Sequence, residues 1–164
     1  VHVLFWIMFV GLCIKTGAIA ISFFVSLFIN PVAAHNLFEG LDLAAVLTFG
    51  KVHYIIMGSL LILLTGSQAY IGYHVVSLFL KFDLAKPFNA AVADRFIRIS
   101  YVALAAGFVA MLGKAYSDRI LKNGIEVPIH WAAGEILLFA GVIYLIAQVF
   151  QKGIELQTEN ELTV

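Results

Sequence analysis

The feature that most constrains the fold is a run of 27 residues near the start of the chain, residues 3–29, in which Lys15 is the only charged side chain. A helix of about 20 apolar residues crosses the hydrocarbon core of a bilayer. The run therefore predicts a transmembrane helix and is too long for the apolar region of a signal peptide. Asn30-Pro31 follows it, and a residue that precedes proline disfavours helical angles, so the helix should end there.

Three more apolar runs of comparable character follow, at residues 52–80, 96–112 and 129–150. Hydrophobic residues make up 62% of the 164 residues and charged residues only 12%, about half the share of soluble domains. A soluble protein of this size could not bury that much apolar surface. The sequence predicts one all-α integral membrane domain, residues 1–164, with four transmembrane helices in one antiparallel bundle and a polar C-terminal tail at 151–164.

The connections carry their own signals. Residues 36–47 could form a short helix at the membrane interface. Asn89 can cap a helix that runs into the third span, and Asn123-Gly124 is a typical turn pair.

An even number of spans places both termini on the same side of the membrane. Basic residues favour the cytoplasmic side. The side of the termini has five, Lys81, Lys86, Arg95, Arg98 and Lys152, and the opposite side has four, Lys51, Lys114, Arg119 and Lys122. This small excess favours cytoplasmic termini.

Lys15 is the first candidate functional residue. It lies about 18 Å from the start of its helix at the rise of 1.5 Å per residue, and an ammonium at that depth should face polar groups inside the bundle. The same count places Gln68 near the level of Lys15 and Glu135 about 10 Å shallower. We expect an intramembrane polar cluster of these three residues that fixes helix register. The alternatives are a proton- or ion-linked transport path and contact of Lys15 with a partner chain or a lipid headgroup. Separately, the chain is a candidate for a homo-oligomer.

The histidines are the only candidates for a haem or metal site. His35, His53 and His130 are all expected at the outer ends of the spans, where three imidazoles could ligate a transition metal. No pair has the spacing of ligands on one helix, so we expect ordinary hydrogen-bonded histidines, no metal and no cofactor.

The inner side offers a candidate docking surface made of residues 81–98 and the tail. Arg95 and Arg98 are three residues apart and share a helix face. The charged residues assigned to this surface are Lys86, Arg95, Arg98, Glu155, Glu159 and Glu161. Anchoring by positive charge is the alternative interpretation of the basic residues. Ten basic and ten acidic residues leave no net charge that would favour direct binding of nucleic acid.

Three stretches resemble a known family: DLAKPFNAAVADRFIRISYVAL at 83–104, the terminal KGIELQTENELTV at 152–164, and the opening GLCIKTGA at 11–18. They are similar to the bacterial membrane-protein family known as domain of unknown function DUF 2975, and GLCIKTGA resembles its Bacteroidetes members. The resemblance implies four spans, the bacterial inner membrane and a genomic neighbour that encodes a small helix-turn-helix regulator. It supplies no functional residues.

The chain contains no nucleophile–base set, phosphate-binding loop or pair of hydrolytic acids. Our first hypothesis is therefore a non-enzymatic inner-membrane protein that binds or regulates a cytoplasmic helix-turn-helix transcription factor. The alternatives are a small transport or channel-like subunit that uses Lys15, Gln68 and Glu135, and a membrane subunit that carries haem or metal.

Overall fold

The structure is a computed structural model that describes residues 2–81 and 88–162. Within these two ranges the chain is helical and has no strand, which confirms the all-α class. The elements in chain order are α1 (His2–Phe28), the short 3-10 helix η1 (Pro31–His35), α2 (Ala44–Phe49), α3 (Lys51–Lys81), α4 (Ala90–Leu121) and α5 (Ala133–Leu162). Four of these helices, α1, α3, α4 and α5, are long and apolar enough to cross a membrane.

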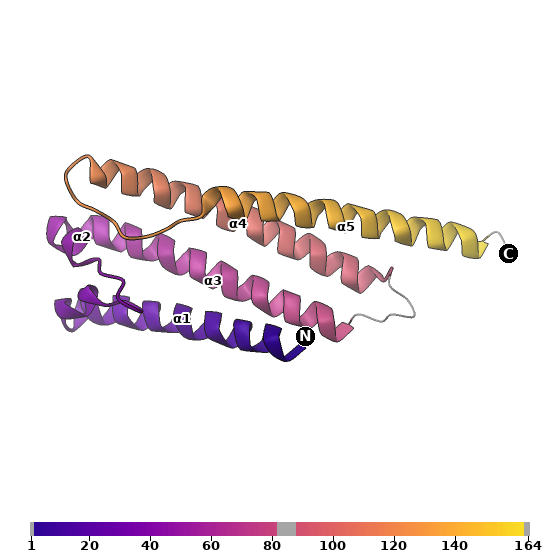
Figure 1. Ribbon diagram of the computed structural model, residues 1–164, viewed down its shortest axis with the longest axis horizontal. Helices are drawn as coiled ribbons and strands as arrows, with labels where there is room; N and C mark the ends of the chain where they lie inside the picture. The colour runs from indigo at the N-terminus through magenta and orange to yellow at the C-terminus, as the bar shows by residue number, and fades with distance from the viewer. Residues whose placement is uncertain (1, 82–87, 163–164) are drawn as a thin grey trace.

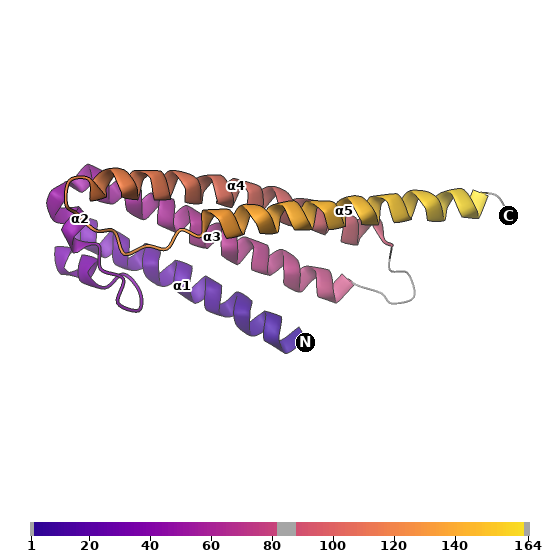
Figure 2. The ribbon, with the colours of Figure 1, turned by 45° about the horizontal axis from the view of Figure 1, so that its top comes forward.

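The four long helices pack in chain order, as Figures 1 and 2 show. Helix α3 contacts both α1 and α4, and α4 contacts α5. Over the described residues α1 has no contact with α4 or α5, so the helices form a row and not a closed ring. Helix α2 and the segment at 124–132 begin at one end of the long helices, and the start of α1 and the end of α5 both point toward the opposite end (Figure 1).

Two helix starts follow from capping side chains. The Asn89 side chain accepts a hydrogen bond of 2.8 Å from the Ala91 amide and caps α4, as predicted. The Asn30 side chain accepts one of 3.1 Å from the Val32 amide and caps η1, after α1 has ended at Phe28.

The connection between α1 and α3 differs from the expected interfacial helix. Residues 36–43 form a loop in which Glu39 and Gly40 have φ of 47° and 83°, both in the left-handed region, and a helix begins only at α2. Leu37 and Leu43 from this loop are almost completely buried. The two leucines therefore pack into the core, whereas Asn36, Glu39, Gly40 and Asp42 of the same loop are exposed.

The fourth helix begins later than its apolar run. Residues 124–132 are non-helical, and α5 starts at Ala133. Trp131 anchors this segment: its side chain is 4% exposed, and its Nε1 donates a 2.8 Å hydrogen bond to the Ser117 hydroxyl on α4. The segment runs along the other helices before α5 begins. Helix α5 is therefore shifted parallel to the helix axes and projects past the end of α4 (Figure 1).

The third helix is longer than its apolar run. Helix α4 covers 32 residues, whereas the predicted span covers 96–112. Its last turns carry charged side chains that end the apolar run without ending the helix. Ile120 is buried there, and the Tyr116 hydroxyl forms a 2.6 Å hydrogen bond with His53 Nδ1 on α3.

The main core lies at the end that holds α2. Tyr54 is fully buried there and packs on Phe23 of α1, with ring centroids 5.2 Å apart. A smaller cluster at the other end joins α3 and α4 through Leu78, Val92 and Ile99. Outside these clusters the long helices expose large apolar side chains. In the most apolar 18-residue stretch of α1, only 6% of the residues are buried.

Candidate functional site

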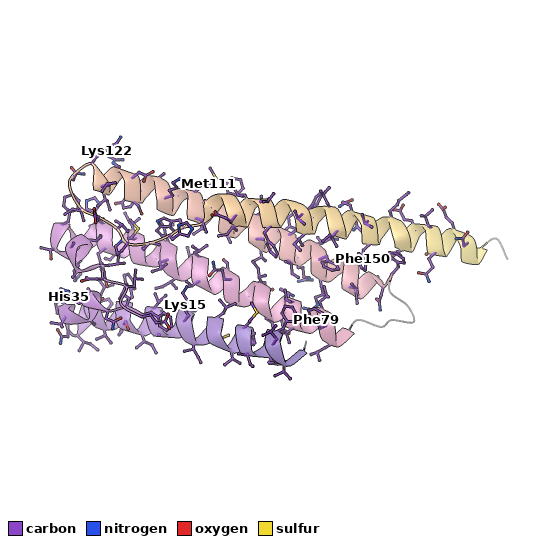
Figure 3. The ribbon with its side chains drawn as sticks, in the orientation of Figure 1. Lys15, His35, Phe79, Met111, Lys122 and Phe150 are labelled. Atoms are coloured by element: carbon purple, nitrogen blue, oxygen red, sulfur yellow. The ribbon has the colours of Figure 1, made fainter. Side chains whose placement is uncertain are left out.

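Lys15 lies midway along α1 and lines a cavity of about 300 Å³ (Figure 3). The cavity is bounded by α1, α3, the loop at 36–43 and the segment before α5. Gln68 and Thr65 of α3 line the same cavity, so the structure brings two of the three predicted cluster residues together. The lining also includes seven apolar residues, Ile19, Phe38, Leu41, Leu61, Leu64, Pro128 and Ile129, and two further polar ones, Glu39 and His130.

Neither Lys15 nor Gln68 has a hydrogen bond or ion pair with any residue in the described ranges. Both side chains are half-buried. An ammonium carries three donors and no acceptor, and an amide carries both kinds of group. The cavity therefore contains a positive charge and an amide whose hydrogen-bonding capacity the protein itself does not fill.

Glu39 is a cavity residue that the sequence reasoning missed. It lines the same cavity from the loop side, together with His130 from the segment before α5. Its side chain is exposed and forms no ion pair with Lys15 among the described residues. The signal that could have pointed to a tight turn is the Glu39-Gly40 pair, because glycine favours the left-handed conformation found there.

Glu135 lies elsewhere. It is in the first turn of α5 and lines a second cavity, of about 500 Å³, that also includes Lys114 and Asp118 of α4. Its carboxylate lies 3.8 Å from His130 Nε2, and its side chain is 72% exposed. The structure thus places Lys15 and Gln68 on one cavity and Glu135 on another, with His130 lining both.

The predicted docking tail is the helical end of α5. The Phe150 ring lies 5.6 Å from Phe88 and 5.0 Å from Phe96, between ring centroids, and a Cβ at Gly153 would overlap the Phe88 ring. These contacts place residue 153 at the first turns of α4. Residues 155–160 beyond it are all exposed.

The charged residues of the docking hypothesis have different surroundings. Lys152 donates a 2.6 Å hydrogen bond to Glu155 one turn further along the helix. Glu159 lies on the exposed part of α5, and Glu161 lies in its last turn. Lys86 is outside the described residues.

The two arginines of α4 also differ. Arg95 is half-buried, and its Nη1 donates a 2.8 Å hydrogen bond to Nδ1 of the buried His74 on α3. Because the arginine is the donor, His74 accepts through Nδ1 and carries its hydrogen on Nε2. Arg98, by contrast, is exposed. Arg95 therefore joins α3 to α4, and Arg98 is available to a partner or a lipid headgroup.

The three candidate metal histidines are in three different environments. His35 Nδ1 lies 3.2 Å from the Asp42 carboxylate, His53 bonds to Tyr116, and His130 lies near Glu135. Within the described ranges no group of three or more His, Cys, Asp or Glu side chains could hold a metal ion.

Comparison with known proteins gives no relative. No family model matches the chain, and no curated protein or solved structure is detectably similar to it.

Proposed function

We propose that the chain is a non-enzymatic, multi-pass protein of the bacterial inner membrane, related to the DUF 2975 family, that binds a cytoplasmic helix-turn-helix regulator. In this proposal α1, α3, α4 and α5 cross the membrane as one antiparallel bundle with both termini in the cytoplasm. The exposed apolar side chains of the long helices support membrane insertion, since a protein surface of this kind is stable only in lipid or against a partner.

The observation that carries the partner proposal is the projection of α5 past α4. Gly153 lies against the Phe88 ring just before α4, and the helix continues to Leu162 with residues 155–160 exposed. Residues 151–164 hold three acidic side chains and one basic one. DNA-binding domains carry a basic surface, so a projecting acidic helix is complementary to such a domain in charge.

The proposed orientation places the projecting end of α5 in the cytoplasm. The projecting end of α5 lies at the end of the row where the chain starts (Figure 1). The sequence count of five basic residues against four supports a cytoplasmic location of that side under the positive-inside rule, and the excess comes from Lys86, which is outside the described residues. A cytoplasmic regulator could then reach the tail without crossing the membrane.

The proposal is tested by photo-crosslinking in native membranes. A photoreactive amino acid at Leu156, 52% exposed on the projecting part of α5, should crosslink to a helix-turn-helix protein that mass spectrometry identifies. The matched control is the same substitution at Leu145, 65% exposed on the apolar part of α5, which should crosslink to lipid.

A chain that ends at residue 153 keeps the contact of Gly153 with Phe88 and should lose the partner. Recovery of the same partner from the shortened chain, or capture of transport subunits alone, would refute the proposal. The second of these outcomes would favour the transport-subunit alternative.

A further inference from the structure

We propose that the cavity at Lys15 is a binding site for a small organic monoanion, a carboxylate attached to an apolar body. The site does not depend on the regulator proposed above, because it lies midway along α1, away from the projecting end of α5. Three properties of the cavity determine the chemistry of the ligand: the unpaired polar groups, the charges and the apolar lining residues.

The unpaired groups call for a ligand that accepts hydrogen bonds and carries negative charge. Lys15 offers three donors and Gln68 offers two, and neither group has a partner in the described part of the chain. The Thr65 hydroxyl already donates 3.0 Å to the Leu61 carbonyl, which leaves its oxygen as an acceptor only. A carboxylate placed between Lys15 and Gln68 would satisfy both with charge-assisted bonds.

The charges limit the ligand to one negative charge. Lys15 is the single permanent cation on the cavity wall, and Glu39 contributes a carboxylate on the loop side. A phosphate dianion would place its second charge against Glu39 with no cation to balance it. A monocarboxylate needs only Lys15.

The lining and the volume set the rest of the ligand. Seven of the twelve lining residues are apolar and five are polar or charged, which suits a ligand with a polar group and a short aliphatic or aromatic body. The volume of about 300 Å³ is at the lower end of the range for small-molecule sites. The ligand is therefore a short-chain carboxylate from water or the carboxylate end of a membrane fatty acid.

The test uses the full chain in lipid nanodiscs and two probes. Hexanoate in the buffer, followed by titration calorimetry, represents the aqueous source, and its uncharged isostere hexanamide is the control ligand. Hexadecanoate, isotopically labelled at its carboxyl carbon and present in the bilayer, represents the lipid source, and its carboxyl resonance reports binding. We expect saturable binding of at least one carboxylate and none of hexanamide.

Two variants of cavity residues and one control variant connect binding to the cavity. Lys15→Met should weaken carboxylate binding by about tenfold or more, which corresponds to about 1.4 kcal/mol. The matched control Lys51→Met removes an exposed lysine that does not line the cavity and should leave binding unchanged. Glu39→Gln removes the opposing charge from an exposed side chain and should strengthen binding by up to about fivefold.

The Glu39 variant keeps the test decisive if loss of Lys15 unfolds the chain, because the exposed Glu39 side chain contributes little to packing. Binding of hexanoate supports the aqueous source, and binding of hexadecanoate alone supports the lipid source. The proposal would be overturned if neither probe binds, or if hexanamide binds as tightly as hexanoate. It would also be overturned if Glu39→Gln binds the carboxylate no more tightly than the wild type does.

Discussion

The contact between Ser26 and Tyr54 offers a quantitative test of how α1 is held against α3. Their hydroxyl oxygens lie 2.6 Å apart. The Ser26 hydroxyl also lies 2.7 Å from the Phe23 carbonyl, to which it donates. Its hydrogen is thus engaged, so the Tyr54 hydroxyl is the donor between the helices. Tyr54 is fully buried, and Ser26 is 2% exposed, so water cannot replace either partner.

This direction of donation predicts unequal costs for the two single deletions. Tyr54→Phe removes the donor and leaves only an acceptor position on Ser26 empty. Hydrogen bonds between helices in membranes contribute about 0.6 kcal/mol on average and at most about 1.7 kcal/mol, so we expect a loss near the lower figure. Ser26→Ala leaves the buried Tyr54 hydroxyl without an acceptor, which costs about 1–3 kcal/mol.

The double variant separates the hydrogen bond from the rest of the packing. With Ser26→Ala and Tyr54→Phe together, no hydroxyl remains unpaired, and the ring of residue 54 still packs on Phe23. The double variant should therefore lose less stability than the sum of the two single variants, with a coupling energy of the order of 1 kcal/mol.

The assay is reversible unfolding of the full chain in mixed micelles, followed by circular dichroism as the fraction of denaturing detergent rises. The matched controls are Ser59→Ala and Tyr70→Phe, which alter exposed side chains of α3 and should leave the free energy of unfolding nearly unchanged. A cost for Tyr54→Phe equal to that of Tyr70→Phe, or strict additivity in the double variant, would refute the reasoning.

Two other predictions concern the connections. Gly113→Ala would place a Cβ 2.5 Å from the buried Trp131 ring, and we expect about 1–3 kcal/mol of destabilisation from overpacking, with loss of the native tryptophan fluorescence maximum before global unfolding. A hydrogen bond from the Ala44 amide and, to a smaller extent, the contact with His35 lower the pKa of Asp42 below its ordinary value of 3.8. A carboxylate with a depressed pKa stabilises the fold above the unfolded pKa and loses this effect as pH falls through the folded value. The unfolding midpoint of the wild type should therefore exceed that of Asp42→Asn at neutral pH, and the difference should shrink as the pH falls below 3.8 and vanish once the pH is below the folded pKa; a constant difference across that range would contradict the assignment.

The sequence was sufficient to find the long helices, because run length and hydropathy depend only on local composition. Helix ends were harder to place. Helix α4 continues past Leu112 through charged turns whose few buried residues, such as Ile120, do not form an apolar run. The late start of α5 depends on the bond from Trp131 to Ser117, a contact between distant residues that no local pattern reveals.

The candidate site shows the same division. Counting residues along two helices placed Lys15 and Gln68 at similar depth, and they do line one cavity. The same count for Glu135 assumed a helix that starts near Ile129, whereas α5 starts at Ala133 and Glu135 falls in its first turn. Glu39 escaped attention because it reaches the cavity from a loop, where residue spacing carries no information about depth.

Because α5 starts late, the two ends of the long helices are built from different elements. At the end that holds α2, an irregular segment at 124–132 occupies the place where a fourth helix would stand, whereas α5 stands beside α4 at the opposite end. An extended chain has a smaller cross-section than a helix with its side chains, which is about 10 Å wide. The short helices η1 and α2, the loop at 36–43 and the segment at 124–132 therefore fill the space at the α2 end, whereas, among the helices described, only long ones stand at the opposite end.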